Sequence, residues 1–510
     1  MSQTASPAST EASRQDRLLF IGCFIALITT SFGFILRAMT LDEWGVQFGL
    51  SATEKGEIFG AGLWPFSISI VLFSLVIDKV GYGRAMVFAF VCHVLSIVLT
   101  VRAKDYSDLY AANVIVALGN GTVEAVINPV VATMFRRDKT KWLNILHAGW
   151  PGGLVLGGVV AIALGDIAWT TKFWLILVPT VLYAALLVRV SFPVQERVGA
   201  GVPYRDMLRE LGALGAFIVL GLIFAEVGSV LTRQGLVEGW TPTAMWSAAA
   251  VVSVAFGLAV RSLGQPLLVI LLLVMLPLAS TELGTDGWIT SLLAPEMKHL
   301  GLNAGWVLIY TSAIMMVLRF FAGAIVHALS PLVLLMTSSA VAALGLFWLS
   351  GSSGAAILAA ATLYGFGKTF FWPTMLGVVS ERFPKGGALT LNAMGGVGML
   401  AAGIVGNSLF GFWQDTGKAK HLLREHPALH AQVVVEKSSV FGAYQAVDAQ
   451  REAALPSAEQ ATLTAVTGLV QKETLGKVAV LPVCMFTAYL LLWVYFRSRG
   501  GYKPVELHTQ

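Results

Sequence analysis

The feature that most constrains this chain is a series of apolar segments, each about 20 residues long, which is the length that an α-helix needs to cross a lipid bilayer. Only 12% of its 510 residues are charged, against about a quarter in soluble proteins. We therefore predict an all-α polytopic membrane protein. A sliding window predicts fourteen transmembrane helices, over residues 18–42, 54–77, 84–102, 107–135, 142–165, 172–191, 211–231, 243–261, 265–293, 304–327, 331–350, 354–379, 387–413 and 476–496.

The lysine and arginine residues of the tails and short loops predict the orientation of these helices. They gather on the side of the N-terminus and are sparse on the opposite side. Cytoplasmic loops carry this excess, so both termini are expected to be cytoplasmic. The net charge of +5 then reflects topology, and no nucleic acid is expected as a partner. We expect a monomer embedded in the lipid bilayer of the cell membrane, which is the inner membrane if the source is a Gram-negative bacterium.

Short motifs repeat in the same order along the chain. "LDEWG" has a counterpart in "TDGWI", which aligns Asp42 with Asp286. The fourth and twelfth predicted helices align at the same spacing, which places Lys368 opposite Glu124. Related halves are common in secondary transporters, so these matches predict two homologous six-helix halves.

The repeat divides the chain into parts. The predicted organisation is a disordered cytoplasmic tail (1–17), an N-terminal six-helix half (18–191), a cytoplasmic linker with two inserted transmembrane helices (192–264), a C-terminal six-helix half (265–496) that includes an outer loop (414–475), and a cytoplasmic tail (497–510). We expect the outer loop to form short helices that act as a lid or external scaffold, because about 60 residues barely sustain a core of their own.

The cytoplasmic loop after the second predicted helix reads "SLVIDKVGYGR". Asp78 and Arg84 have the spacing of the DRxGRR loop signature of the major facilitator superfamily, and the chain resembles that superfamily. The resemblance implies a major facilitator fold with two extra helices inserted between its halves. Asp78 can accept hydrogen bonds from a helix end or from Arg84, so we predict a gating latch here. Arg319 should brace the second copy of the loop, and Arg37 is a candidate for an external gate.

Glu124 is the most unusual residue of the predicted membrane interior. A charge at the centre of a bilayer costs about 2.5–3.5 kcal/mol on insertion scales, so such residues usually face a cavity. Pro129 loosens the same helix nearby. We therefore predict that Glu124 carries the coupling proton. Lys368, which is its counterpart in the other half, would form a switchable ion pair with Glu124 across the cavity.

Two motifs resemble the fucose, galactose and glucose proton symporter family within the superfamily. "EAVINP" matches that family's ExxxNP motif through Glu124 and Asn128, and "STELGTDGWI" matches its E-x-G-x-x-x-W pattern through Glu282 and Trp288. The resemblance implies proton-coupled sugar transport with an essential acid. The first predicted helix lacks the family's NDxL motif, and Asp42 is the nearest candidate for that acid. Glu282 and Asp286 complete the set of proton-coupling candidates.

Polar and aromatic residues inside the other apolar segments are candidates for binding the solute. Amide groups can bind hydroxyls, a histidine can relay protons, and tryptophan beside proline offers a flat surface for a sugar ring. The predicted substrate-binding residues are Asn128, Asn144, His147, Trp150, Trp288, Lys368, Trp372 and Asn392.

These features favour a secondary active transporter, a proton-coupled symporter that imports a sugar or similar neutral polar solute by alternating access. The alternatives are a proton-coupled transporter of an organic anion or peptide, to which Lys368 and Arg37 would be suited, or an exporter. An enzyme is not expected, because no catalytic constellation is found. The three cysteines lie in apolar runs and predict no metal site, and no cofactor is expected. No ATP-binding signature occurs, so a gradient must supply the energy.

Overall fold

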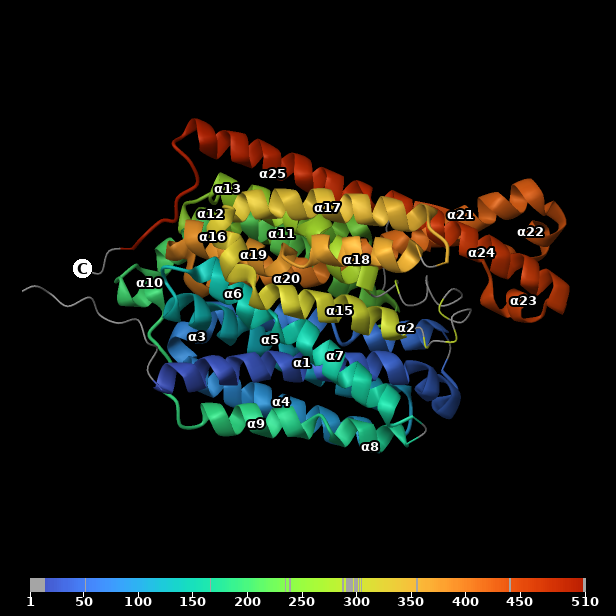
Figure 1. Cartoon of the computed structure of the whole chain (residues 1–510), viewed down its shortest axis with the longest axis horizontal. Coiled ribbons are helices and arrows are strands. Elements are labelled where there is room, and N and C mark those ends of the chain that lie inside the picture. The colour runs from blue at the N-terminus through green and yellow to red at the C-terminus, as the bar shows by residue number, and fades with distance from the viewer. Residues whose placement is uncertain are drawn as a thin grey trace, which may run out of the picture.

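The computed structural model describes residues 14–507 except 51, 166, 234, 238–239, 287–288, 290–296, 298–300, 302, 304, 355 and 440–441. Its helices run side by side along the long axis of the molecule (Figure 1). Within the described residues, twelve helices are long and apolar enough to cross a membrane. The protein is therefore a multi-pass membrane protein.

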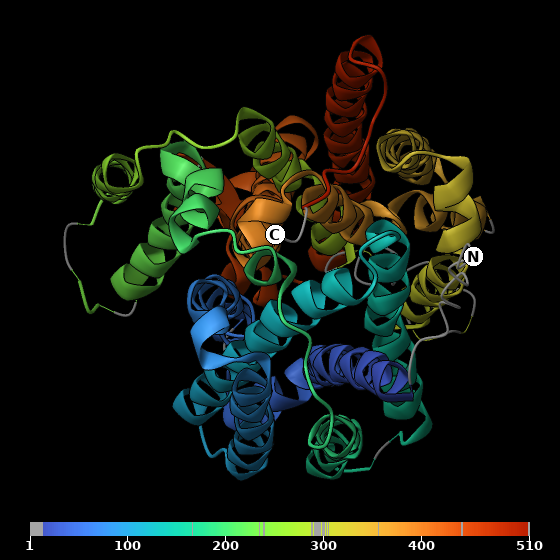
Figure 2. The same cartoon turned by 90° about the vertical axis from the view of Figure 1, so that its left-hand side faces the viewer.

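The first part of the chain forms helices that coincide with the first six predicted spans. Several spans consist of two consecutive helices. They are α1 (Arg14–Phe48), α2 (Ala52–Gly60), α3 (Trp64–Val80), α4 (Tyr82–Arg102), α5 (Tyr106–Met134), α6 (Lys139–His147), α7 (Gly149–Ala163), α8 (Trp169–Trp174) and α9 (Leu177–Leu187). Figure 2, which looks along the helices, shows this blue and teal group on one side of the molecule.

Next come α10 (Glu196–Gly199), in the predicted linker, and the two helices that we predicted as an inserted pair, α11 (Tyr204–Arg233) and α12 (Pro242–Val260). α11 contacts α12 on one side and the core helix α20 (Gly387–Leu400) on the other. The first of the two inserted helices therefore touches the core of the bundle.

The later part of the bundle contains more breaks than the sequence predicted. Its elements are α13 (Pro266–Ala279), the π-helical turn η1 (Ser280–Gly284), α15 (Gly305–Phe320), α16 (Ala322–Ala328), α17 (Pro331–Gly351), α18 (Ala356–Lys368), α19 (Phe371–Arg382), the 3₁₀ turn η2 (Pro384–Gly386), α20 and the π-helical segment η3 (Ala401–Asn407). α15 falls short of the length of a full span, and the predicted span 354–379 is divided between α18 and α19. The count of fourteen spans stays a prediction.

A small module follows at the end of the bundle opposite the end of α25 (Figure 1). It consists of α21 (Ser408–Glu425), α22 (Pro427–Val433), strands β1 (Val434–Ser439) and β2 (Gly442–Val447), α23 (Ala449–Ala453) and α24 (Ser457–Val478), which leads into α25 (Val480–Ser498). The strands are antiparallel, with Val434 opposite Val447. Leu422, Val433 and Leu463 belong to its apolar core. The hairpin was not predicted from the sequence.

Close contact between α5 and α3 fixes the position of residues in the interior of the bundle. A Cβ atom added to Gly121 would lie 2.2 Å from the carbonyl oxygen of Phe66. Only glycine allows α5 and α3 to approach this closely. The next turn of α5 carries Glu124, whose position is therefore fixed by backbone contact.

Candidate functional site

Glu124 lies in the centre of the bundle within a short chain of hydrogen bonds. Its Oε2 accepts a hydrogen bond of 2.6 Å from Nδ2 of Asn128, one turn along α5. The Oδ1 atom of Asn128 lies 2.9 Å from Nε2 of His147, which is 4.0 Å from Glu124 Oε2. Only 4% of Glu124 is exposed. Glu124 and Asn128, which one sequence motif selected, are thus brought together with His147, which we selected separately.

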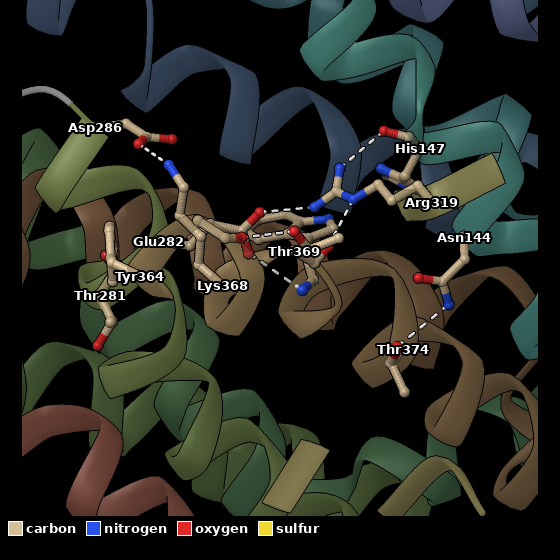
Figure 3. Close-up of polar contacts among 12 residues, drawn as sticks. Asn144, His147, Thr281, Glu282, Asp286, Arg319, Tyr364, Lys368, Thr369 and Thr374 are labelled. Carbon is tan, nitrogen blue, oxygen red and sulfur yellow. Dashed lines mark hydrogen bonds and ion pairs between the residues drawn. The ribbon is translucent and has the colours of Figure 1, made fainter. Parts of the chain in front are cut away.

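Arg319 connects this chain to the second part of the bundle. Its Nη2 donates to Oε1 of Glu282 at 2.9 Å, and its Nε donates to the carbonyl oxygen of Thr369 at 2.7 Å. Its Nη1 donates to the carbonyl oxygen of His147 at 2.8 Å. Figure 3 shows these three bonds spreading from one guanidinium. We expected Arg319 to brace a cytoplasmic loop, but it is 1% exposed and joins buried groups in the core.

Lys368 pairs with Asp286, and not with Glu124 as we predicted. Its Nζ donates to Oδ1 of Asp286, and it lies 5.3 Å from the ring centroid of Tyr364. Figure 3 shows the lysine side chain pointing away from His147. The prediction considered only repeat-related positions, whereas Asp286 lies two residues after the end of η1, within reach of Lys368.

The charges of this cluster do not balance. The described residues place three acidic side chains in it, those of Glu124, Glu282 and Asp286, and two basic side chains, those of Arg319 and Lys368. Glu282 and Asp286 each have a cationic partner. Glu124 instead contacts an amide and an imidazole. Glu124 is therefore the acid of this cluster whose charge no cation among the described residues offsets, and an unpaired buried carboxylate is unfavourable.

At breaks in the helices, backbone N–H and carbonyl groups lack helical partners and form hydrogen bonds with side chains of the site. Pro373 has no N–H, so the carbonyl of Thr369, four residues earlier, lacks its helical donor and accepts from Arg319. The N–H of Trp372 lies in the first turn of α19, where helix N–H groups have no partner, and it donates to Oε2 of Glu282 at 3.2 Å. Thr369 was missed from the sequence, although its position four residues before a proline was a usable signal.

Two buried asparagines lie nearby, each with an amide oxygen that has no donor among the described residues. Asn144 Nδ2 donates to Oγ1 of Thr374 at 3.2 Å, and Asn392 Nδ2 donates to the carbonyl oxygen of Ala125 at 3.1 Å. Both bonds join the early part of the chain to the late part. The free oxygens could accept hydrogen bonds from a hydroxyl-bearing solute.

The predicted tryptophans have different surroundings. Trp372 is buried, and a Cβ on Gly398 would clash with its ring. Trp150 is half-buried and lies 5.7 Å from the ring of Phe34. Trp288 lies outside the described residues, and nothing is said of the side chain of Asp42, whose backbone belongs to α1.

The latch residue Asp78 has a partner that we did not predict. Its carboxylate pairs with Arg197 of α10, whose Nη1 also donates to the carbonyl oxygen of Val202 at 2.5 Å. Arg84 is exposed. The sequence motif identified the acid but gave no signal for an arginine so distant in the chain.

A second group of buried polar contacts, around Glu381, was also missed from the sequence. Oε1 of Glu381 accepts from the hydroxyl of Thr140 at 2.5 Å, and Oε2 accepts from the phenol of Tyr502 at 2.7 Å. Lys139 Nζ donates to Glu196 Oε2 at 2.6 Å. Burial, together with the Glu381 carboxylate, raises the pKa of the Tyr502 phenol well above its ordinary value, so the phenol remains a donor at neutral pH.

A helical bundle with charged side chains buried in its membrane-spanning part is typical of membrane transporters, among other membrane proteins that move ions or solutes. Comparison of sequences agrees with this class, because the model of the Major Facilitator Superfamily matches residues 18–407. The chain belongs to the major facilitator superfamily, as the loop signature indicated.

Individual relatives are distant. The 3-(3-hydroxy-phenyl)propionate transporter of Escherichia coli K12 is 25% identical over 182 residues, which cover 33% of this chain and 44% of that protein. The chain spans less than half the length of the curated relatives it matches.

Solved structures share the fold at low identity. The human organic anion transporter MFSD10 superposes with a TM-score of 0.57 at 12% identity, covering 94% of this chain and all of that one. The fucose:proton symporter FucP of E. coli gives a TM-score of 0.51 at 13% identity, covering 90% and 98%. At such identities the likeness shows the fold alone.

Proposed function

We propose that this protein is a proton-coupled symporter that imports a sugar or similar neutral polar solute by alternating access. The observation that carries this proposal is the position of Glu124. It is the acid of the central cluster that has no cationic partner among the described residues. Protonation of Glu124 makes the acidic and basic charges of the cluster equal, which lowers the electrostatic cost of switching the loaded transporter between its outward-facing and inward-facing states.

A neutral solute fits the remaining charges. Arg319 and Lys368 are already bound to carboxylates, so neither is free to neutralise an anion in this state. The amide oxygens of Asn144 and Asn392 are acceptors, which favours a solute that donates through hydroxyl groups. FucP, a fucose:proton symporter, shares the fold.

Transport of an organic anion or peptide is the alternative, as is export. It would require Lys368 to leave Asp286 and bind the solute instead. Two proteins similar to this chain are named as transporters of 3-(3-hydroxy-phenyl)propionate and of organic anions.

The topology belongs to the same proposal. Fourteen transmembrane helices in a six, two and six arrangement would place both termini in the cytoplasm and the module of residues 414–475 outside the cell membrane. The pair of Asp78 and Arg197 then closes the cytoplasmic end. A monomer is sufficient for this mechanism.

Uptake into proteoliposomes tests the proposal. Labelled hexoses, pentoses and organic acids are supplied with and without an inward proton gradient to wild type, Glu124→Gln and the control Glu226→Gln, which replaces an acid of α11 outside the cluster. We expect the gradient to accelerate uptake of one neutral solute about 10-fold or more, and Glu124→Gln to lose that acceleration while solute exchange persists. Unchanged acceleration in Glu124→Gln would contradict the proposed role.

A further inference from the structure

Arg37 is a buried cation that lies in α1, away from the central cluster. It is 7% exposed and lines a small cavity among α1, α2 and α5, together with apolar residues such as Phe34, Trp44 and Phe59. The proposed function gives this cavity no role.

The guanidinium of Arg37 has no acidic partner among the described residues. Its Nη2 donates to Oγ of Ser96 at 3.0 Å, and its Cζ lies 5.6 Å from the ring centroid of Phe173. Its Nε is buried and has no acceptor in the described part of the chain. Removing a cation from water costs several kcal/mol unless an opposite charge accompanies it. Neither a hydroxyl nor a benzene ring supplies that charge.

A second donor in the lining of the same cavity is also unsatisfied. Trp44 is fully buried against Trp169 and Phe173, and its Nε1 has no acceptor within the described ranges. Asn120, which lines the cavity too, uses its amide oxygen to contact His93 Nε2 at 3.0 Å, so its NH₂ group remains. Arg37 Nε and Trp44 Nε1 are thus buried donors without acceptors, and Arg37 is a cation; the lining also contains the amide oxygen of Asn113, whose Nδ2 donates to the carbonyl oxygen of Leu109.

We propose that this cavity binds a small monovalent anion, either an inorganic ion such as chloride or the carboxylate group of an organic acid. An anion would neutralise Arg37 and accept from the unsatisfied N–H groups of Arg37 and Trp44. The cavity is too small for a whole sugar, and its apolar lining would exclude strongly hydrated divalent anions. The site is separate from Glu124, so it does not depend on proton coupling.

Thermal unfolding of the purified full-length protein tests the site without any transport assay. Chloride, bromide, acetate or benzoate replaces methanesulfonate, a monovalent anion whose three-oxygen head group is bulkier than a halide or a carboxylate, from 1 to 100 mM at constant ionic strength. Binding to the folded state should raise the unfolding temperature by about 2–5 °C in the wild type. Arg37→Gln should abolish the rise, and the control Arg209→Gln, at a partly exposed arginine on α11, should keep it.

The salts identify the source of the anion. A rise with chloride and bromide but not with acetate or benzoate assigns an inorganic ion, and the reverse assigns an organic acid. Trp44→Phe, which keeps an aromatic ring but removes one donor, should weaken anion binding several-fold. This variant tests the site if Arg37→Gln does not fold. An unfolding temperature of the wild type that is the same in all these salts would overturn the proposal, as would a rise that persists in Arg37→Gln. Neither result bears on the role of Glu124.

Discussion

Arg319 donates a hydrogen bond to the carbonyl of His147, which is the carbonyl that Pro151 leaves without its helical donor. The same relationship holds at Thr369 and Pro373, again with Arg319 as the donor. Each proline therefore creates an acceptor four residues before it, and a side chain from another helix occupies that acceptor.

The same arrangement, a carbonyl left free by a proline and bound by a side chain of another helix, occurs at a third proline. Pro129 leaves the carbonyl of Ala125 free, and Nδ2 of Asn392 donates to it. The bonds from Arg319 to His147 and from Asn392 to Ala125 join the early and late parts of the bundle. Because they involve carbonyls and not opposite charges, they can break during a conformational change without leaving an unpaired ion.

Pro151→Ala tests this interpretation. Alanine restores an N–H that can bond to the carbonyl of His147, which would compete with Arg319. We expect uptake to fall about 10-fold while the free energy of unfolding changes by no more than about 1 kcal/mol, because one hydrogen bond replaces another. Uptake and thermal unfolding measure the two effects.

Pro242→Ala is the matched control for that experiment. Pro242 is exposed and begins α12, where a missing N–H has no consequence. Uptake by this variant should equal that of the wild type. Equal loss in both variants would mean that proline substitution itself, and not the bond to Arg319, reduces transport.

The ion pair of Arg319 and Glu282 should show strong coupling between the two residues. Removing one partner leaves a buried charge, so Arg319→Met alone should destabilise the protein by about 3–5 kcal/mol. Arg319→Met combined with Glu282→Gln removes both charges and should recover part of that loss, because the carbonyls of His147 and Thr369 still lack their donor. Chemical unfolding of the two single variants and the double variant gives the coupling energy. If the stability changes of the two single variants simply add in the double variant, Arg319 and Glu282 are not energetically coupled.

Uptake by a double variant that removes the pair of Lys368 and Asp286 distinguishes a neutral solute from an anionic one. If the solute is neutral, Lys368→Met with Asp286→Asn should keep uptake within about 3-fold, because the pair is removed as a unit. If the solute is an anion that binds Lys368, the same variant should lose affinity by about 100-fold, the usual value of a charge-assisted hydrogen bond. The Michaelis constant for each solute in the uptake panel distinguishes these outcomes.

The sequence predicted the membrane-spanning character and the superfamily, because apolar length and the Asp78 loop are local patterns. It also selected Glu124, Asn128 and His147, which the structure brings into contact. It could not give the partner of a charge. Lys368 was assigned to Glu124 by repeat symmetry, yet its pairing with Asp286 depends on the path of the chain through η1. Glu381 and Arg197 were missed because their partners are more than 100 residues away.

The C-terminal tail should stabilise the conformation that is closed at its own end of the bundle. Tyr502 donates to Glu381, which also accepts from Thr140, and the N–H of Val505 donates to the carbonyl oxygen of Glu381 at 2.8 Å. The tail thus reinforces the same glutamate that links α6 to α19. Opening this end must separate Thr140 from Glu381, and the tail holds Glu381 in place for that bond.

Deletion of residues 499–510 should therefore favour opening at this end. In a variant without native cysteines, Thr133→Cys reports on the buried cavity that Thr133 lines beside Lys139 and Ser380. We expect the deletion to increase the rate of maleimide labelling of this cysteine about 5-fold or more, since losing the hydrogen bonds to Glu381 removes roughly 1 kcal/mol or more from the closed state. Tyr502→Phe should give a smaller increase in the same direction, whereas Tyr495→Phe, at an exposed position of α25, should give none. A labelling rate that does not change on deletion would show that Thr140 and Glu381 hold this end closed without the tail.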